Sequence, residues 1–450
     1  MKEFTGALTD NQIKGYQEQF RANPLNRVAL NAITKTALND VALNREAFIE
    51  SDFTFSHTVK TGQATAQMAS GRCWMFAGLN TMRTRAMKKM NLATFELSQN
   101  YTFFWDKLEK ANYFLENIIT TCDEHIQSRI VMWLLQTFLS DGGQWDMFAN
   151  LIRRYGVVPK TVMPESFNSS NSGYINYFVG LKLKEDAMTL REMGRKTAKI
   201  EALRQKKEEM MAEIYKILCI YFGEPPKSFV WQWRDKKDKF HREAKPMTPQ
   251  EFYKKYVNLD LDEMVSLINC PTKDKSYNKM YTVQFLGNVV GGDIVRYLNL
   301  ETKILRDITA KVVSKGEPVW FGCDVGKMFS RDGGIMHTKI YEYDKLLGVK
   351  FGMDKAQRVD YCDSLMTHAM VFTGVNLVKG KPTKWKVENS WGDKVGEKGF
   401  FVMNDDWFNE YLYQVVVPKK YLSPTLQKVL KEKPIELKPW DPMGSLAVMH

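Results

Sequence analysis

The sequence is poor in cysteine and has no long run of apolar residues. Its six cysteines stand far apart and follow no regular spacing, which argues against the disulfide framework of a secreted protein. No apolar run approaches the roughly 18 residues of a membrane-spanning helix, and the first ten residues lack the apolar core of a signal peptide. We therefore expect a cytoplasmic protein that makes no contact with a membrane.

Internal repeats and low-complexity tracts are also missing, which indicates a globular chain. With 450 residues, 44% of them hydrophobic, it can bury a large core in two or three lobes. The net charge of +12 is carried largely by helical patterns in which acids and bases alternate, as at 191–196 and 233–239, and this is typical of a solvated face. The alternative is weak, non-specific binding to nucleic acid, since no motif for specific recognition is present.

One cysteine differs from the others in its surroundings. Cys73 follows Ser70-Gly71-Arg72, a turn with little bulk, and precedes apolar residues at helical spacing. The pattern predicts Cys73 on the first turn of a helix, where the macrodipole and free N–H groups favour a thiolate. Most isolated cysteines are core-packing residues, and we interpret the remaining five in that way: Cys122, Cys219, Cys270, Cys323 and Cys362.

Two distant segments supply the groups that a cysteine nucleophile needs. His368 lies in a β-branched and aromatic run that predicts a buried strand, and Asn389 precedes Ser390-Trp391-Gly392. An imidazole can hold a thiol as thiolate, and an amide oxygen can orient the imidazole. Taken singly, such a histidine is usually a core residue and such an asparagine a turn residue, but their order after Cys73 favours catalysis. Four other histidines lack comparable neighbours, and we interpret them as structural or exposed: His57, His125, His241 and His337.

These segments resemble the three active-site motifs of papain-like cysteine peptidases. More closely, the sequence from about Asn26 onward is similar to the bleomycin hydrolase and bacterial aminopeptidase C family. The resemblance implies that Cys73 is the nucleophile, His368 the general base and acid, Asn389 the residue that orients the imidazole, and Gln67 a side-chain donor to the oxyanion. It also implies an acyl-enzyme intermediate and no metal or organic cofactor.

The implied fold is α+β, a papain-like two-lobe fold with a helical lobe, an antiparallel β-barrel-like lobe, a large helical insertion and a C-terminal arm. His368 follows Cys73 by 295 residues (368 − 73), whereas small papain-like enzymes have about 130–150. We therefore expect five parts: an N-terminal helical extension (1–45), a helical lobe (46–165), a helical insertion (166–276), a β lobe (277–420) and the arm (421–450). Local patterns predict helices over 96–115 and 129–139, and strands over 318–325, 369–378, 384–387, 399–403 and 411–417.

Substrate-binding residues are predicted from a second set of resemblances. Gly142 and Gly143 follow Asp141 in a loop that resembles the papain-like substrate loop, and glycines let a peptide backbone come close. Trp391 would shield the bond between His368 and Asn389 from water and line the substrate site. The papain-like pattern usually has a cysteine three positions before the nucleophile, whereas this sequence has Ser70.

The C-terminal segment 439–447 resembles the family's terminal arm, which lies in the cleft. The resemblance implies that Ala447 reaches the substrate site and that the terminal carboxylate pairs with the amino group of a peptide, which would make the protein an aminopeptidase. Because the chain continues with Val448-Met449-His450, an endopeptidase or oligopeptidase is the first alternative. A non-enzymatic nucleic-acid-binding scaffold and an amidase or transglutaminase-like enzyme are alternatives from other classes. The resemblance further implies a homo-hexamer whose active sites face an interior cavity.

Overall fold

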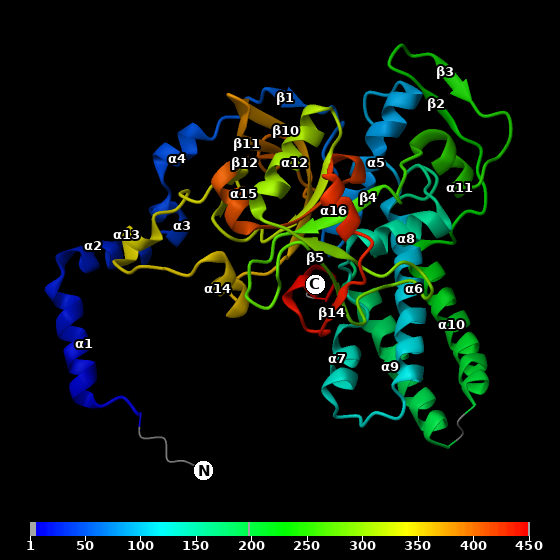
Figure 1. Cartoon of the computed structure of the whole chain (residues 1–450), viewed down its shortest axis with the longest axis horizontal. Coiled ribbons are helices and arrows are strands. Elements are labelled where there is room, and N and C mark those ends of the chain that lie inside the picture. Colours follow the sequence, from blue (N-terminus) through cyan, green and yellow to red (C-terminus); the bar gives the residue numbers. More distant parts are fainter. Residues whose placement is uncertain (1–5, 197–198, 449–450) are drawn as a thin grey trace.

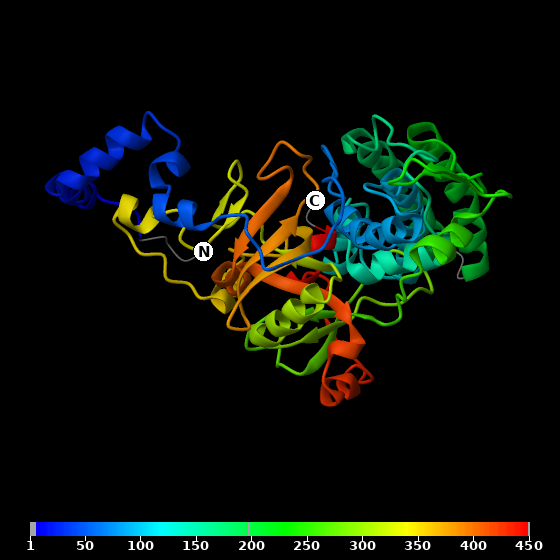
Figure 2. The ribbon, with the colours of Figure 1, turned by 90° about the horizontal axis from the view of Figure 1, so that it is seen from above.

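The structure is a computed structural model that describes residues 6–196 and 199–448. Most helices between residues 73 and 257 gather on one side of the molecule, the sheet lies beside them, and the N-terminal helices project at the far side of the sheet (Figure 1, Figure 2). Within the described residues, no helix combines the length and apolar composition that crossing a bilayer needs.

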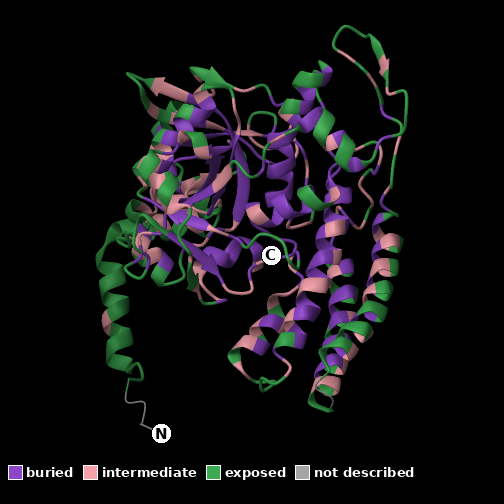
Figure 3. Ribbon diagram, turned by 45° about the vertical axis from the view of Figure 1, so that its right-hand side comes forward, coloured by how far each residue is buried: buried purple, intermediate pink, exposed green. Residues whose placement is uncertain are grey.

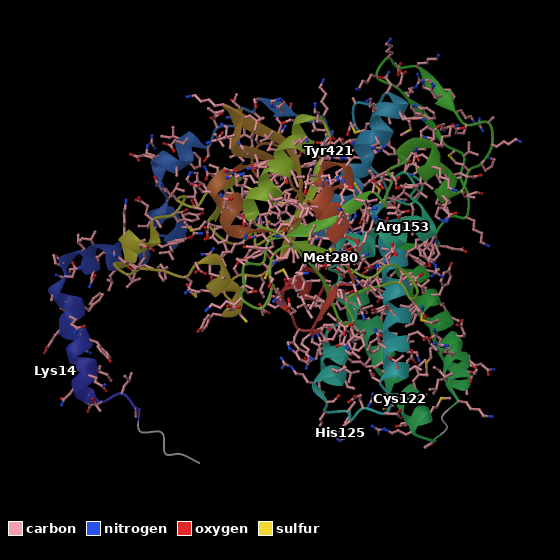
Figure 4. All side chains as sticks on the ribbon, in the orientation of Figure 1. Lys14, Cys122, His125, Arg153, Met280 and Tyr421 are labelled. Carbon is pink, nitrogen blue, oxygen red and sulfur yellow. The ribbon has the colours of Figure 1, made fainter. Side chains whose placement is uncertain are left out.

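Four helices form the N-terminal part of the chain, and the last two place Ala42 and Ala47 in an apolar cluster with residues of the sheet such as Ile335 and Val402. They are α1 (Asp10–Ala22), α2 (Pro24–Ile33), α3 (Leu38–Ala42) and α4 (Arg45–Glu50). Thr9 and Asn23 cap α1 and α2, yet neither helix buries a residue. Lys14 marks how far α1 extends from the sheet (Figure 4).

The helical side contains two largely buried helices, which begin at Cys73 and Gln99. Its elements are α5 (Cys73–Met90), α6 (Gln99–Thr120), α7 (Arg129–Thr137), α8 (Trp145–Tyr155), α9 (Gly173–Lys196), α10 (Ile200–Phe222), α11 (Pro249–Phe252), the π-helix η1 (Tyr253–Val257) and the hairpin β2 (Gln232–Arg234) and β3 (Phe240–Arg242). Fourteen of the 18 residues of α5 are buried, because other elements cover almost all of its faces (Figure 3).

Twelve strands of the described chain form one mixed sheet. They are β1 (His57–Thr58), β4 (Met264–Ile268), β5 (Lys279–Val283), β6 (Tyr297–Asn299), β7 (Val319–Cys323), β8 (Phe329–Ser330), β9 (Ile335–Met336), β10 (His368–Val378), β11 (Lys381–Glu388), β12 (Phe400–Asn404), β13 (Leu412–Pro418) and β14 (Ile435–Leu437). The order is β14-β5-β6-β4-β13-β7-β10-β11-β12-β9-β8, with β1 also on β10. Most neighbours are antiparallel, and β14–β5, β4–β6 and β12–β9 are parallel.

Short helices and the long α12 cover the sheet and its ends. They are α12 (Thr302–Ser314), α13 (Tyr343–Leu347), α14 (Lys355–Asp360), α15 (Asp405–Tyr411), η2 (Lys419–Tyr421), α16 (Pro424–Val429), η3 (Pro442–Gly444) and α17 (Ser445–Val448). One apolar cluster joins α5, α6, α8, α9 and α10 and reaches the sheet at Trp320 and Val371. A second cluster lies between the sheet and α12 and α15.

The α+β fold class predicted from the sequence is confirmed, and the predicted helices and strands are present with ends that differ by up to five residues. The range 166–276, expected to be a helical insertion, is not wholly helical. It contains the β2–β3 hairpin and β4, which pairs with β13 in the main sheet. The five apolar or small residues of β4 have no period that distinguishes a short strand from a buried helical turn.

Candidate active site

Cys73 is the first residue of α5, as the sequence predicts. The turn before it ends at Arg72, whose carbonyl accepts the first helical hydrogen bonds, from the N–H groups of Met75 and Phe76. Cys73 is only 1% exposed, and the following Trp74 is completely buried. The indole N–H of Trp320 in β7 donates to the carbonyl of Trp74 over 3.0 Å. The start of the helix is thereby fixed against the sheet.

His368 and Asn389 lie at adjoining ends of paired strands. His368 opens β10, Asn389 follows β11, and the two strands pair antiparallel. His368 Nε2 lies 2.8 Å from Asn389 Oδ1, so the hydrogen-bonding tautomer carries a proton on Nε2. The ring of Trp391 packs against the imidazole with centroids 4.9 Å apart, and Asn389 is 1% exposed. Trp391 is thus placed to shield this bond.

The helix that carries Cys73 and the strand that carries His368 lie against each other. The backbone N–H of Ala369, the residue after His368, donates to the Cys73 thiol. The segment before Cys73 also pairs with the segment after Asn389: the N–H of Gln67 donates to the carbonyl of Ser390 over 2.8 Å. Residues from three distant parts of the sequence are therefore brought to one site.

Gln67 is held with its amide nitrogen toward the turn before Cys73. Its Oε1 accepts a hydrogen bond from the Ser390 hydroxyl over 2.7 Å, and its Nε2 donates to the carbonyl of Ser70 over 2.6 Å. The amide oxygen of Gln67 therefore points away from the turn, and the amide N–H groups point toward the turn. This orientation fits a donor to an oxyanion.

The protonation of Cys73 differs from the sequence prediction. Burial raises the pKa of the Cys73 thiol to about 12, although the N–H groups of Ala369, Trp74 and Cys73 itself lower it in part. The start of a helix therefore does not by itself yield a thiolate here, because desolvation outweighs the nearby N–H groups. Formation of a thiolate at neutral pH therefore needs a neighbouring group that takes the thiol proton or supplies positive charge.

The two glycines predicted to bind substrate have other contacts. The carbonyl of Gly142 accepts from Lys110 Nζ over 2.6 Å, and its N–H donates to the Ser140 hydroxyl over 3.0 Å. A Cβ on Gly143 would lie 2.5 Å from the ring of Trp74. The main-chain groups of Gly142 are therefore already paired, and Gly143 is required for close packing against the helix that carries Cys73.

The C-terminal arm is anchored to both sides of the molecule. Strand β14 pairs with β5, and the Arg129 guanidinium lies 3.6 Å from the centre of the Trp440 ring. The Ser445 hydroxyl donates to the carbonyl of Met366, two residues before His368, over 2.8 Å. Ala447 is buried beside a small cavity of about 40 Å³. The arm thus ends between the sheet and the helices (Figure 2), while Met449, His450 and the terminal carboxylate lie outside the described residues.

Three ion pairs around these residues, in which only Glu165 is partly exposed, were missed by the sequence analysis. Arg72 pairs with Glu165 over 2.8 Å, Lys107 with Asp141 over 2.7 Å, and Arg83 with Glu388 over 2.5 Å. Arg72 directly precedes Cys73 and Glu388 directly precedes Asn389, but no local pattern indicates their partners. In the chain as described, no group of three or more His, Cys, Asp and Glu side chains is placed to hold a metal ion.

The larger cavities of the described structure lie away from this site. One of about 800 Å³ is lined by residues such as Arg153 and Met280, both labelled in Figure 4. Another of about 520 Å³ lies between the later part of α5 and the end of α12. Neither is lined by Cys73, His368 or Asn389.

The chain is a cysteine-type peptidase and belongs to the Peptidase C1-like family, whose model matches residues 7–444. It is 48% identical over 441 residues to Aminopeptidase C of Listeria innocua serovar 6a, covering 98% of this chain and 99% of that protein. It is 39% identical over 453 residues to human bleomycin hydrolase, with 98% and 99% covered. The crystal structure of PepW from Lactobacillus rhamnosis HN001 matches with a TM-score of 0.96 and 49% identity, covering 98% of this chain and 99% of that one. The family resemblance found in the sequence is thereby confirmed.

Proposed function

We propose that the protein is a cysteine aminopeptidase that releases N-terminal residues from peptides. The observation that carries the proposal is the 2.8 Å contact between His368 Nε2 and Asn389 Oδ1, directly beside the residue whose N–H meets the Cys73 thiol. A nucleophile, a base and a residue that orients the base form the arrangement typical of thiol catalysis. The relatives named Aminopeptidase C support the preference for N-terminal residues.

In the proposed mechanism, His368 Nδ1 takes the thiol proton while Asn389 keeps the ring oriented through Nε2. The Cys73 thiolate attacks the scissile carbonyl, and the backbone N–H of Cys73 and the side chain of Gln67 stabilise the negative charge on its oxygen. His368 then donates the proton to the leaving amine, which leaves an acyl-enzyme. Water, deprotonated by the same imidazole, attacks the thioester, and the proton returns to the thiolate when the acid product leaves.

The buried arm supports a cleft that is closed on one side. Ser445, Leu446 and Ala447 are all buried, and the arm is tied to the segment that leads into His368. A peptide in such a cleft would meet the end of the chain after a fixed number of residues. The position of that end would then define how many residues are removed.

The direct test is hydrolysis of one peptide in free and N-acetylated form. We expect stepwise release of amino acids from the free peptide, no cleavage of the acetylated one, and no activity in Cys73→Ala. Equal cleavage of both peptides by the full chain would overturn exopeptidase action in favour of an endopeptidase or oligopeptidase.

A version that ends at Ala447 measures how the last three residues affect the products. Transfer of the acyl group to an added amine in place of water would favour the amidase or transglutaminase-like alternative.

We further propose a cytoplasmic homo-hexamer. The helices α1 and α2 bury no residue and expose Tyr16, Phe20, Leu25 and Val28, and an amphipathic helix with an open apolar face needs a partner. Light scattering should report six chains for the full protein and fewer for Phe20→Asp combined with Leu25→Asp. A monomeric full-length protein at micromolar concentration would rule out the hexamer.

Salt-dependent retention on DNA without effect on hydrolysis would mark nucleic-acid binding as a side property of the basic surface.

A further inference from the structure

The turn that leads into Cys73 is held by charged side chains on both flanks. On one flank, Arg72 forms two hydrogen bonds with Glu165, of 2.8 and 3.2 Å, and its Nε donates to the Ser70 hydroxyl over 2.8 Å. Arg72 is completely buried, and its guanidinium lies 4.9 Å from the centre of the Phe103 ring. This arginine is fixed in place although it belongs to an irregular segment.

On the other flank, the Asp141 carboxylate gathers four donors. Its Oδ2 accepts the backbone N–H of Gly71 over 3.0 Å and the Ser172 hydroxyl. Its Oδ1 accepts a hydrogen bond from Asn176 Nδ2 over 2.8 Å and forms an ion pair with Lys107 Nζ at 2.7 Å. Because the carboxylate is 3% exposed and bonded on both oxygens, it has one orientation.

The main chain of Asp141 is tied to the same helix start. Its carbonyl accepts the indole N–H of Trp74 over 2.7 Å, so side chain and backbone together hold Gly71 and Trp74, the neighbours on either side of Arg72 and Cys73. Ser70, the position where a papain-like pattern has a cysteine, makes hydrogen bonds to its own turn, and all six cysteines are free. The turn is therefore held by charge and hydrogen bonds without a covalent cross-link.

We propose that Asp141 is a positioning residue for the oxyanion site, because it fixes the turn that presents the backbone N–H of Cys73 to the substrate carbonyl. The inference rests on the proposed function. An oxyanion donor acts only when it points at the place where charge develops, and small displacements weaken it. Two of the four donors, Ser172 and Asn176, lie at the start of α9, so the first residues of the expected helical insertion would support catalysis through Asp141.

The test separates oxyanion stabilisation from formation of the thiolate. Alkylation of Cys73 by iodoacetamide needs the thiolate but no oxyanion donor, whereas hydrolysis needs both. For Asp141→Asn we expect kcat to fall about 10- to 100-fold, a part of the 10²–10³ expected for complete loss of one oxyanion donor. KM and the alkylation rate should remain within about threefold of the wild type.

The matched control is Glu116→Gln, which breaks another buried ion pair on α6, with Lys207 on α10 at 2.6 Å, remote from the turn. It should leave kcat unchanged. If Asp141→Asn does not fold, the double variant Ser172→Ala/Asn176→Ala removes two neutral donors and should lower kcat by a smaller factor, again without effect on alkylation.

An unchanged kcat in the folded variants would overturn the role of Asp141, and so would equal losses in hydrolysis and alkylation. A wild-type protein that alkylates at Cys73 but hydrolyses no peptide would instead overturn the proposed function.

Discussion

Cys73 and His368 reach one site from regions that are held by different forces. On the cysteine side, the irregular turn before Cys73 belongs to no helix or strand, and ion pairs through Arg72 and Asp141 hold it in addition to single backbone bonds such as that from Gln67 to Ser390. On the histidine side, His368 and Asn389 are carried by β10 and β11, whose backbone ladder fixes their spacing. One side thus depends on charge, the other on strand register and packing.

This difference predicts how each side responds to perturbation. A charge pair taken out of water is costly when one partner is lost, so the cysteine side should be sensitive to single charge changes and to acid. A strand ladder tolerates the loss of one side chain, because the backbone hydrogen bonds remain. On the histidine side, substitutions should alter chemistry more than stability.

The largest effect is expected where the two sides meet, at the nucleophile itself. Cys73→Ala removes the thiol of the proposed nucleophile and should lower kcat/KM by at least about 10⁴-fold, as is typical of a lost nucleophile. The exposed Cys362 provides the control, and Cys362→Ala should keep full activity. Residual hydrolysis by Cys73→Ala within tenfold of the wild type would show that another group performs the reaction.

The second largest effect concerns the ion pair that joins the two sides. Arg83 in α5 and Glu388 in β11 are both buried, and Arg83 also donates to the carbonyl of Gln63 over 2.7 Å. Arg83→Met should lower the free energy of unfolding by about 3–5 kcal/mol, because it leaves Glu388 buried without its cation. Urea denaturation measures the change. The exposed pair of Lys303 and Asp307 provides the comparison, and Lys303→Met should have no measurable effect.

A third, smaller effect tests the histidine side. Asn389→Ala frees the imidazole to rotate and should reduce kcat on the order of 10²-fold, because the ring no longer keeps the required tautomer and direction. The melting temperature should change little, since the ladder between β10 and β11 remains. Asn376→Ala, at the exposed end of β10, is the matched control and should be fully active. A large loss of stability in Asn389→Ala would contradict the contrast drawn between the two sides.

The smallest effect is the response of the cysteine side to acid. Burial raises the pKa values of Asp141 and Glu165, but Lys107 and Arg72 with their hydrogen bonds outweigh burial and hold both pKa values below their ordinary range. A carboxylate with a lowered pKa adds stability that is complete above its unfolded pKa of about 4 and is lost as the pH falls through the folded value.

Melting temperatures measured from pH 7 down to about pH 2 should reveal this loss. Below about pH 4, the melting temperature of the wild type should fall more steeply than that of a Lys107→Met/Asp141→Asn variant, which has lost one of the two pairs. Identical slopes would show that the lowered pKa of Asp141 adds nothing to acid stability.

Regular elements were predicted well because their periodicity is local. The apolar spacing after Cys73 indicates a helix, and the β-branched run around His368 indicates a strand, and both are present as α5 and β10. Features that depend on the third dimension have no such local signal. Main-chain groups of Gly142 are paired with Lys110 and Ser140, and the thiol is so deeply buried that its pKa is raised to about 12, which no spacing in the sequence indicates.

The sequence by itself determined the elements, the order of the three motifs and the family, because these depend on residue type and local spacing. Only the tertiary structure decided how the motifs are held together: Asp141 reaches Gly71 from 70 positions away, and Arg83 reaches Glu388 from 305 positions away. Such contacts form only after the chain has folded and water has been excluded, and the strength of a charge pair depends on that exclusion. No pattern along the chain specifies the partner of a buried charge.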